Sequence, residues 1–177
     1  MNWNIDTAHS HVDFSVKHLG IATVRGRFRT FGGSARTDAN GALVGFSADI
    51  DAASIETGVD QRDAHLRSAD FFDTEHHPNM HFESTAITPL GGRQYRADGT
   101  LSMRGETKPV TLDIELTDAV KDPWGNTKIG ATATGKIRRS EWGLTWNQVL
   151  EVGGLMVSDD VKIALEVEGS GSSNNNN

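Results

Sequence analysis

Alternation between apolar and polar side chains dominates the chain. In the segment HVDFSVKH at 11–18, Val12, Phe14 and Val16 fall on one face of an extended chain, and mostly polar side chains fall on the other. Successive side chains of a strand point to opposite sides, so this pattern predicts a strand with one buried and one wet face. Eight segments share the pattern, at 11–18, 23–31, 42–51, 80–87, 95–103, 110–116, 128–138 and 161–167.

The predicted strands favour a closed antiparallel barrel. Turn-forming sequences such as DANG at 38–41 and DPWGN at 122–126 separate many of them, and no regular alternation with helices points to a parallel α/β sheet. Eight antiparallel strands with one apolar face each can close as an up-and-down barrel, which removes free sheet edges. Such a barrel is filled by side chains or holds one small ligand. The small inward residues Ala131, Ala133 and Gly135 favour a cavity.

One charged segment interrupts the alternation. In RDAHLRSADFF at 62–72, apolar residues recur at near-helical spacing, which predicts a short amphipathic helix over about 58–69. We expect its charges to be solvated, to pair within the helix or to anchor a neighbouring loop. Leu66, Phe71 and Phe72 are predicted to turn toward the barrel and close one end of its interior as a lid.

Length and composition limit the remaining interpretations. The 177 residues suit one domain, predicted to cover 1–169, and the low-complexity residues 170–177 are predicted to be a disordered tail or linker. The formal net charge of −7 disfavours binding to nucleic-acid phosphate, and the absence of cysteine excludes disulfides and thiolate zinc sites. No apolar run is long enough for a transmembrane segment, and no signal-peptide pattern is present. The expected location is therefore the cytoplasm, or the periplasm or exterior if a signal peptide was removed.

Residues capable of metal binding or catalysis do not form a recognised motif. His9 and His11 could bind a metal together with a neighbouring carboxylate, Asp6 or Asp13, but no third histidine follows at a suitable spacing. The histidines within 76–81 also lack a known ligand spacing. No nucleophile elbow and no phosphate-binding loop is present. We therefore predict no metal, no cofactor and no catalytic residue.

A row of arginines lies on the predicted outer face of one strand. Arg25, Arg27 and Arg29 alternate with Val24, Gly26 and Phe28, so they point away from the interior. Solubility and protection of a sheet edge are the favoured roles. Docking to an anionic membrane or to a phosphate head group is the less favoured one.

Several long segments occur in an order that resembles a known family. They include WNIDTAHSHVDFSVKHLGIATVRGRFRTFGG, RDAHLRSADFFDTEHHPNMHFES, GTLSMRGETKPVTLDIEL, DPWGNTKIGATATGKIRRSEWGL and VSDDVKIALEVE. From Trp3 to Glu168 the chain resembles the YceI-like, polyisoprenoid-binding proteins. The resemblance implies an extended, lipocalin-like, eight-stranded antiparallel barrel with a helical insertion. It implies a long pore that holds a polyprenyl chain or a similar amphiphile such as a quinone, a binding role rather than an enzymatic one, and a homodimer in many members.

The alternation and the helical spacing select the residues expected to contact such a ligand. A long hydrocarbon gains about 0.8 kcal/mol for each methylene removed from water, so the wall needs apolar residues and no charges along the tail. The predicted lipid-binding residues are Phe14, Val16, Phe28, Phe46, Ile50, Leu66, Phe71, Phe72, Phe82, Leu101, Met103, Leu112, Ile114, Ile137, Trp142, Ile163 and Leu165. The predicted polar mouth comprises His18, Arg62, His65 and Arg67.

Two alternative functions remain open at this stage. A hydrolase or isomerase acting on a lipophilic substrate would need titratable residues facing inward, and the alternation offers few besides His18. A structural barrel with a filled interior would need no ligand at all.

Overall fold

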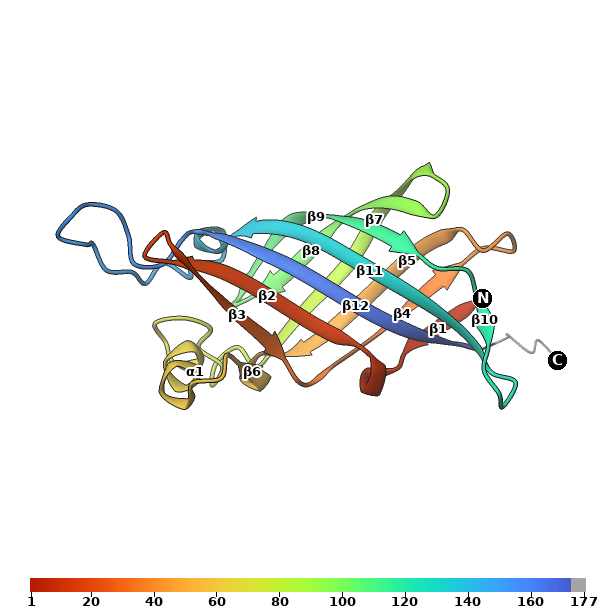
Figure 1. Ribbon diagram of the computed structural model, residues 1–177, viewed down its shortest axis with the longest axis horizontal. Helices are drawn as coiled ribbons and strands as arrows, with labels where there is room; N and C mark the ends of the chain where they lie inside the picture. Colours follow the sequence, from red (N-terminus) through yellow and green to blue (C-terminus); the bar gives the residue numbers. More distant parts are fainter. Residues whose placement is uncertain (173–177) are drawn as a thin grey trace.

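The strands follow one another around the barrel in the order of the sequence. The computed structural model describes residues 1–172, and Figure 1 shows its strands as an elongated barrel with α1 at one end and the N-terminus at the other. The strands are β1 (Asn2–Ile5), β2 (His11–His18), β3 (Ala22–Phe28), β4 (Phe31–Thr37), β5 (Leu43–Asp51), β6 (Ile55–Glu56), β7 (Asn79–Gly91), β8 (Gln94–Met103), β9 (Glu106–Leu116), β10 (Val120–Lys121), β11 (Thr127–Arg138) and β12 (Asp160–Ser172). The helical segments are η1 (Thr7–His9), η2 (Ala52–Ser54), α1 (Asp60–Arg67) and η3 (Arg139–Trp142).

Strands β1 and β2 act as one bent strand, and so do β3 and β4. The two-residue strands β6 and β10 each pair with one neighbour only, so the twelve strands form a barrel of eight. Strands β1 and β2 both pair with β12, β1 with its last residues and β2 with its first half. Strands β3 and β4 continue the arrangement, since β3 pairs with β2 and β4 pairs with β1. The antiparallel pairing of β11 with β12 closes the ring. The predicted all-β, eight-stranded antiparallel barrel is therefore confirmed.

The structure differs from the sequence predictions at three places. Strand β12 runs to Ser172, so the domain does not end at 169: residues 170–172 pair with β1 instead of starting a tail. Residues 173–177 lie outside the described part of the chain. Helix α1 spans only Asp60–Arg67, because Ser68 is already extended. A β-bulge opposite β4 leaves Val44 pointing outward, although the alternation of 42–51 puts it on the same face as Phe46 and Ile50 and so predicts that it points inward.

Three of the charged residues of α1 hold a neighbouring loop in place. Asp63 is only 4% exposed, and its carboxylate accepts a hydrogen bond from the Thr57 backbone N–H at 2.9 Å. Arg62 donates to the Thr57 carbonyl oxygen, and Arg67 donates to the carbonyl oxygens of Ala53 and Ile55. Of the three predicted roles for these charges, anchoring is the one these three residues perform. The anchored segment carries Ile55, which is fully buried.

Two glycines let aromatic rings lie flat against the inside of the wall. Gly26 of β3 is paired with Phe14 of β2, and a Cβ on Gly26 would lie 2.3 Å from the tip of the Phe14 ring. A Cβ on Gly99 would lie 2.4 Å from the Phe82 ring. Real Cβ atoms do not approach other atoms so closely, so any larger residue at either position would displace the ring.

Candidate functional site

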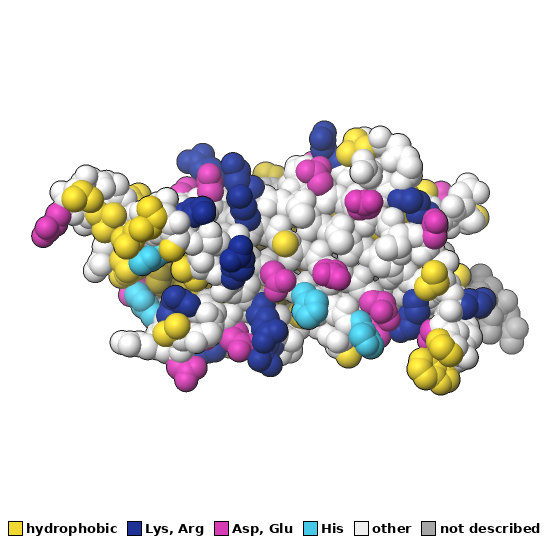
Figure 2. All heavy atoms as spheres, in the orientation of Figure 1, with side chains coloured by type: hydrophobic (Ala, Val, Ile, Leu, Met, Phe, Trp, Pro, Cys, Tyr) yellow, Lys and Arg dark blue, Asp and Glu magenta, His cyan; other side chains and the backbone are white. Residues whose placement is uncertain are grey.

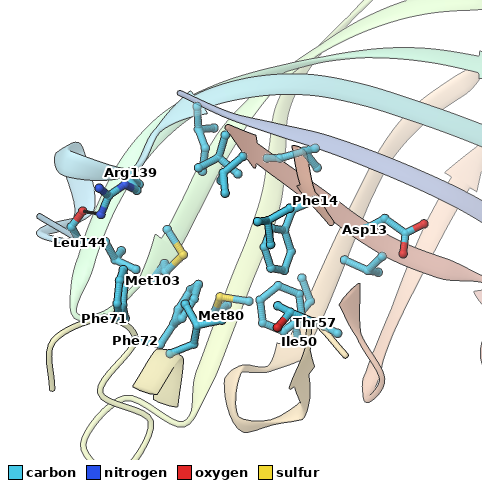
Figure 3. Close-up of a pocket in the computed structure, with 18 of the residues that line it drawn as sticks. Asp13, Phe14, Ile50, Thr57, Phe71, Phe72, Met80, Met103, Arg139 and Leu144 are labelled. Carbon is cyan, nitrogen blue, oxygen red and sulfur yellow. Dashed lines mark hydrogen bonds between the residues drawn. The ribbon is translucent and has the colours of Figure 1, made fainter. Parts of the chain in front are cut away.

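An apolar cavity of about 620 Å³ occupies the α1 end of the barrel. Side chains from the inner faces of the strands line it, and residues of α1 and of the loop after η3 complete the wall. Figure 3 shows Phe14, Met80, Met103 and Phe72 projecting into this space from different elements. A cavity of this volume falls within the range that small-molecule ligands occupy in proteins.

Most residues predicted from the alternation do line this cavity. They are Phe14, Val16, Phe28, Phe46, Ile50, Leu66, Phe71, Phe72, Phe82, Leu101, Met103, Leu112, Ile137, Ile163 and Leu165. Ile114 instead faces a separate, smaller cavity of about 100 Å³. Trp142 does not face either cavity: it is 0% exposed, and its indole N–H donates to the Leu101 carbonyl oxygen at 2.9 Å. Trp142 thus packs under the wall as core.

The paired aromatics after α1 lie at the mouth of the cavity. Phe72 packs edge-on against Phe28, with ring centroids 5.9 Å apart. The ring centroid of Phe71 lies 5.4 Å from that of Trp146 and 5.1 Å from that of His65. These contacts join the helical insertion to the loop that follows η3. Phe71 and Phe72 therefore sit where a lid would sit, and the lid function stays a prediction.

The polar residues of the mouth differ in part from the predicted ones. His18, Arg62 and His65 line the cavity as predicted. Arg67 does not, because its guanidinium is directed at the carbonyl oxygens of the loop below α1. Arg139, which the alternation did not indicate, lines the cavity from η3.

Arg139 is a buried cation held by main-chain oxygens. It donates to the carbonyl oxygens of Leu144 at 2.7 Å and Ser158 at 2.9 Å, and Figure 3 shows the contact with Leu144. Burial lowers the pKa of its guanidinium, while the charge of Asp159 opposes that effect. The side chain ties the loop after η3 to the start of β12. No sequence pattern could have found it, since the partners are backbone groups of a loop.

Few titratable groups face the interior. Besides the histidines and arginines of the mouth, Asp13 borders the cavity, but Figure 3 shows its carboxylate turned away from the apolar side chains. His65 lies 2.8 Å from the carboxylate of Asp70, which is outside the wall. The geometry favours holding an apolar guest over acid–base chemistry on it.

A shared partition separates the large cavity from the small one. Phe46, Ala48, Leu112 and Leu165 line both spaces. Phe46 stacks on Phe82 with ring centroids 5.1 Å apart, which holds its ring in place. The interior thus continues past the main cavity toward the end of the barrel that carries the N-terminus.

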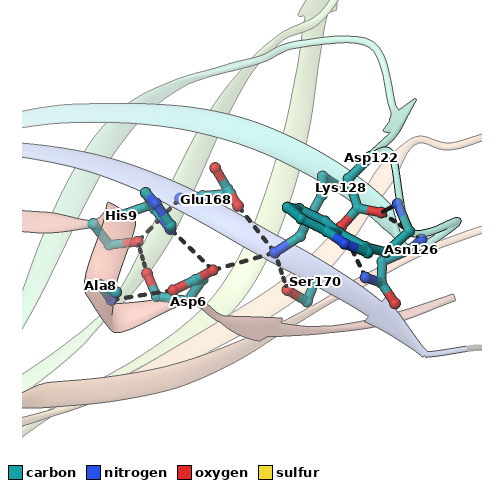
Figure 4. A network of polar contacts seen from close by, with 10 residues as sticks. Asp6, Ala8, His9, Asp122, Asn126, Lys128, Glu168 and Ser170 are labelled. Carbon is teal, nitrogen blue, oxygen red and sulfur yellow. Dashed lines mark hydrogen bonds and ion pairs between the residues drawn. The ribbon is translucent and has the colours of Figure 1, made fainter.

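A polar network lies on the outside of the barrel at that opposite end (Figure 4). Lys128 Nζ lies 3.2 Å from Asp6 Oδ2 and 3.0 Å from Glu168 Oε1, and His9 Nδ1 lies 3.2 Å from Asp6 Oδ2. Hydrogen bonds from His9 and Lys128 lower the pKa of Asp6. The hydrogen bonds from Lys128 to Glu168 and Asp6 raise the pKa of Lys128.

The network contains two of the metal-ligand candidates of the N-terminal segment, Asp6 and His9. Ligand atoms of Asp6, His9 and Glu168 lie within 4.8 Å of one another, a spacing that a metal ion could use. His11 is not among them. The ammonium of Lys128 already lies between the two carboxylates and balances their charge. The cluster is therefore explained by ion pairing.

Comparisons with known proteins agree on one family. The model of the YceI-like domain matches residues 3–169. A UPF0312 protein of Staphylococcus aureus (strain bovine RF122 / ET3-1) is 35% identical over 169 residues, covering 94% of this chain and 96% of its own. A UPF0312 protein of Serratia proteamaculans is 36% identical, covering 91% of this chain and 81% of its own.

Solved structures share the fold. The YceI protein of Campylobacter jejuni is 30% identical and superposes with a TM-score of 0.77 over 89% of this chain and 90% of its own. BcnA of Burkholderia cenocepacia, at 24% identity, reaches a TM-score of 0.80 over 93% of this chain and 98% of its own. A polyisoprenoid binding domain from Saccharophagus degradans, at 15% identity, reaches a TM-score of 0.69 over 96% of this chain and 98% of its own.

None of the described helices is long and apolar enough to cross a membrane.

Proposed function

The chain belongs to the YceI-like family, and on that premise we propose that its barrel binds a polyisoprenoid or a similar long-chain amphiphilic lipid, such as a quinone, for carriage, storage or sequestration. The observation that carries the proposal is the cavity of about 620 Å³ at the α1 end, with its mostly apolar wall. The similarity in fold to the polyisoprenoid binding domain of Saccharophagus degradans supports it.

The energetics of the cavity fit a ligand with a long apolar tail. Each methylene moved from water to this wall gains about 0.8 kcal/mol, and the deep part of the wall presents no charge that the tail would leave desolvated. The polar groups gather at the mouth, where His18, Arg62 and His65 can meet a head group. The tail thus supplies the affinity and the mouth supplies the selectivity.

We propose binding rather than catalysis as the activity of the barrel. Catalysis by general acid and base needs groups placed within hydrogen-bond reach of a reacting atom. The wall residues that surround most of the guest are aliphatic and aromatic. The cytoplasmic location and the homodimer stay predictions.

The proposal is tested by identifying and then blocking the guest. Natively purified protein is extracted with organic solvent, the extract is analysed by mass spectrometry, and uptake of polyprenyl alcohol and of a long-chain quinone is measured. Ala48→Trp would fill the partition region of the cavity, and we expect it to lower uptake by about tenfold or more. The matched control is Val44→Trp, because Val44 lies on the same strand but points outward.

Circular dichroism establishes that both variants are folded before uptake is compared. An empty extract together with no uptake by the wild type would refute the proposal. Conversion of the bound lipid into a product would replace it with an enzymatic function.

A further inference from the structure

The α1 end of the barrel carries an exposed apolar rim. We define the rim as the exposed large hydrophobic residues on the loops of this end; Figure 2 shows apolar side chains gathered there, at the left of the view. Val152 is the most exposed of them, at 94%. The rim residues are Leu19, Ile21, Val59, Val149, Val152 and Leu155.

The loops of the rim form one surface with the mouth of the cavity. The Leu19 N–H donates to the Met156 carbonyl oxygen at 2.8 Å, which joins the β2–β3 turn to the loop before β12. Val149 and Leu155 form an antiparallel bridge within that loop. Met156 and Val59 also line the cavity. Apolar surface therefore continues from the interior out onto the rim.

A belt of basic side chains crosses one side of the barrel, on β11, β12, β2 and β3, just behind the rim. The strand register places Lys136 of β11 opposite Lys162 of β12, Lys162 opposite Ser15 of β2, and Ser15 opposite Arg25 of β3. Figure 2 shows a band of basic side chains crossing the barrel next to the apolar end. We define the belt as Lys17, Arg25, Lys136, Arg138 and Lys162, all exposed.

The belt is not explained by the stability of the fold. Like charges directly opposite on neighbouring strands are destabilising, and Lys136 and Lys162 are such a pair. Among the described residues, Arg25 and Lys162 have no ion-pair partner, whereas Lys136 and Arg138 pair at the surface with Asp160 and Asp159. A chain with net charge −7 thus concentrates positive charge at one level of one end.

We propose that this end of the barrel docks on an anionic lipid bilayer, with the rim in the boundary of the acyl chains and the belt at the level of the head groups. Lys162 lies two residues into β12, which is ~7 Å from the end of the strand. The head-group layer of one leaflet is ~5–8 Å thick, and interfacial apolar faces insert ~5–10 Å. Lys162 thus lies behind the start of the rim loop by a distance similar to the thickness of the head-group layer.

The charges favour a bilayer over a second copy of the chain as the occupant. Two copies joined rim to rim would bring two basic belts toward each other, where they repel. Glu151 is the one carboxylate in the loop segment 143–158, and Asp60 follows the rim residue Val59. The belt carries five cations, two of which pair with Asp159 and Asp160, so three cations remain without a carboxylate partner among the described residues. The surface does not depend on which guest the cavity holds, so the inference goes beyond the proposed function.

Vesicle sedimentation tests the inference. The wild type is expected to sediment with vesicles of phosphatidylcholine mixed with phosphatidylserine, less with phosphatidylcholine alone, and less as salt is raised. The rim variant Val149→Ser, Val152→Ser and Leu155→Ser is expected to bind at least tenfold more weakly. The belt variant Lys136→Gln and Lys162→Gln is expected to bind about 25-fold more weakly, because each charge is worth about fivefold.

The far end of the barrel supplies the matched controls. Val120, Lys121 and Trp124 lie on the β10 hairpin and are exposed, but they adjoin neither the main cavity nor the belt. Val120→Ser with Trp124→Ser, and separately Lys121→Gln, should leave vesicle binding within about twofold. Absence of wild-type binding to the anionic vesicles, or equal losses in the controls, would overturn the inference. So would a dimer, seen by light scattering, that the rim variant dissociates while vesicle binding persists.

Discussion

The two ends of the barrel differ, because the same strands enclose a packed core at one end and a cavity at the other. At the end near the N-terminus, Trp3, Tyr95 and Ile129 are buried, and the network around Lys128 ties β11, β12 and η1 together outside them. At the α1 end the strands surround a cavity, and an inserted segment partly covers its mouth. The tightly packed core and the cavity thus lie at different ends of the barrel. We therefore expect that stability and ligand binding can be changed independently.

The largest effect that would test this separation is expected at the closed end. Trp3→Ala removes a buried ring and its hydrogen bond to Thr37 Oγ1 at 2.9 Å, leaving a buried hydroxyl without that partner. We expect the free energy of unfolding to fall by about 3–5 kcal/mol, measured by urea denaturation. Lipid uptake per folded molecule should stay unchanged. Trp124→Ala is the control, since Trp124 is 84% exposed and its loss should cost less than about 0.5 kcal/mol.

A smaller effect is expected from opening the mouth. Replacing Phe71 and Phe72 by Ala removes the rings that join the inserted segment to Phe28 and Trp146. We expect lipid release to acceptor vesicles to accelerate about 10- to 100-fold, a change of about 1.4–2.8 kcal/mol. Phe31→Ala is the matched control, because Phe31 packs on the core without lining the cavity. Unchanged release in the double variant, or equal acceleration in the control, would contradict the lid.

The smallest effect concerns acid stability at the closed end. The folded state lowers the pKa of Asp6 below its ordinary value of 3.8, so the network stabilises the fold above that pH. The contribution is lost as the pH falls through the lower folded-state pKa. Lys128→Met should flatten this dependence below about pH 4, measured as the unfolding midpoint against pH. An equally steep acid dependence in the variant would show that Lys128 does not contribute, because His9, whose hydrogen bond lowers the pKa of Asp6 most, is still present.

The strands were predictable from the sequence where one face is apolar and the other wet. All eight alternating segments form strands, and their inward positions supply most of the cavity wall. Strands β1 and β4 were missed because four residues are too few to show a period, and because Gly32 and Gly33 blur it. Val44 was misplaced since a bulge shifts the alternation by one residue, which no local pattern reveals.

The mouth was less predictable because loops build it. Trp146, Met156 and Val157 reach the cavity through the loop that Arg139 fastens to the start of β12. Such contacts depend on which distant segments meet, and periodicity carries no information about that. Arg67 was assigned to the mouth from its charge alone, yet its partners are carbonyl oxygens below the helix.

The glycines behind the aromatic rings determine how far these rings project into the cavity, and so how wide the cavity is. The ring of Phe14 rests where a side chain of Gly26 would be, and the ring of Phe82 rests in the same way over Gly99. One added methyl group at Gly26 would push the Phe14 ring inward and narrow the passage, with every residue that touches the guest unchanged. Relatives that carry guests of different girth could therefore differ at positions that never meet the guest.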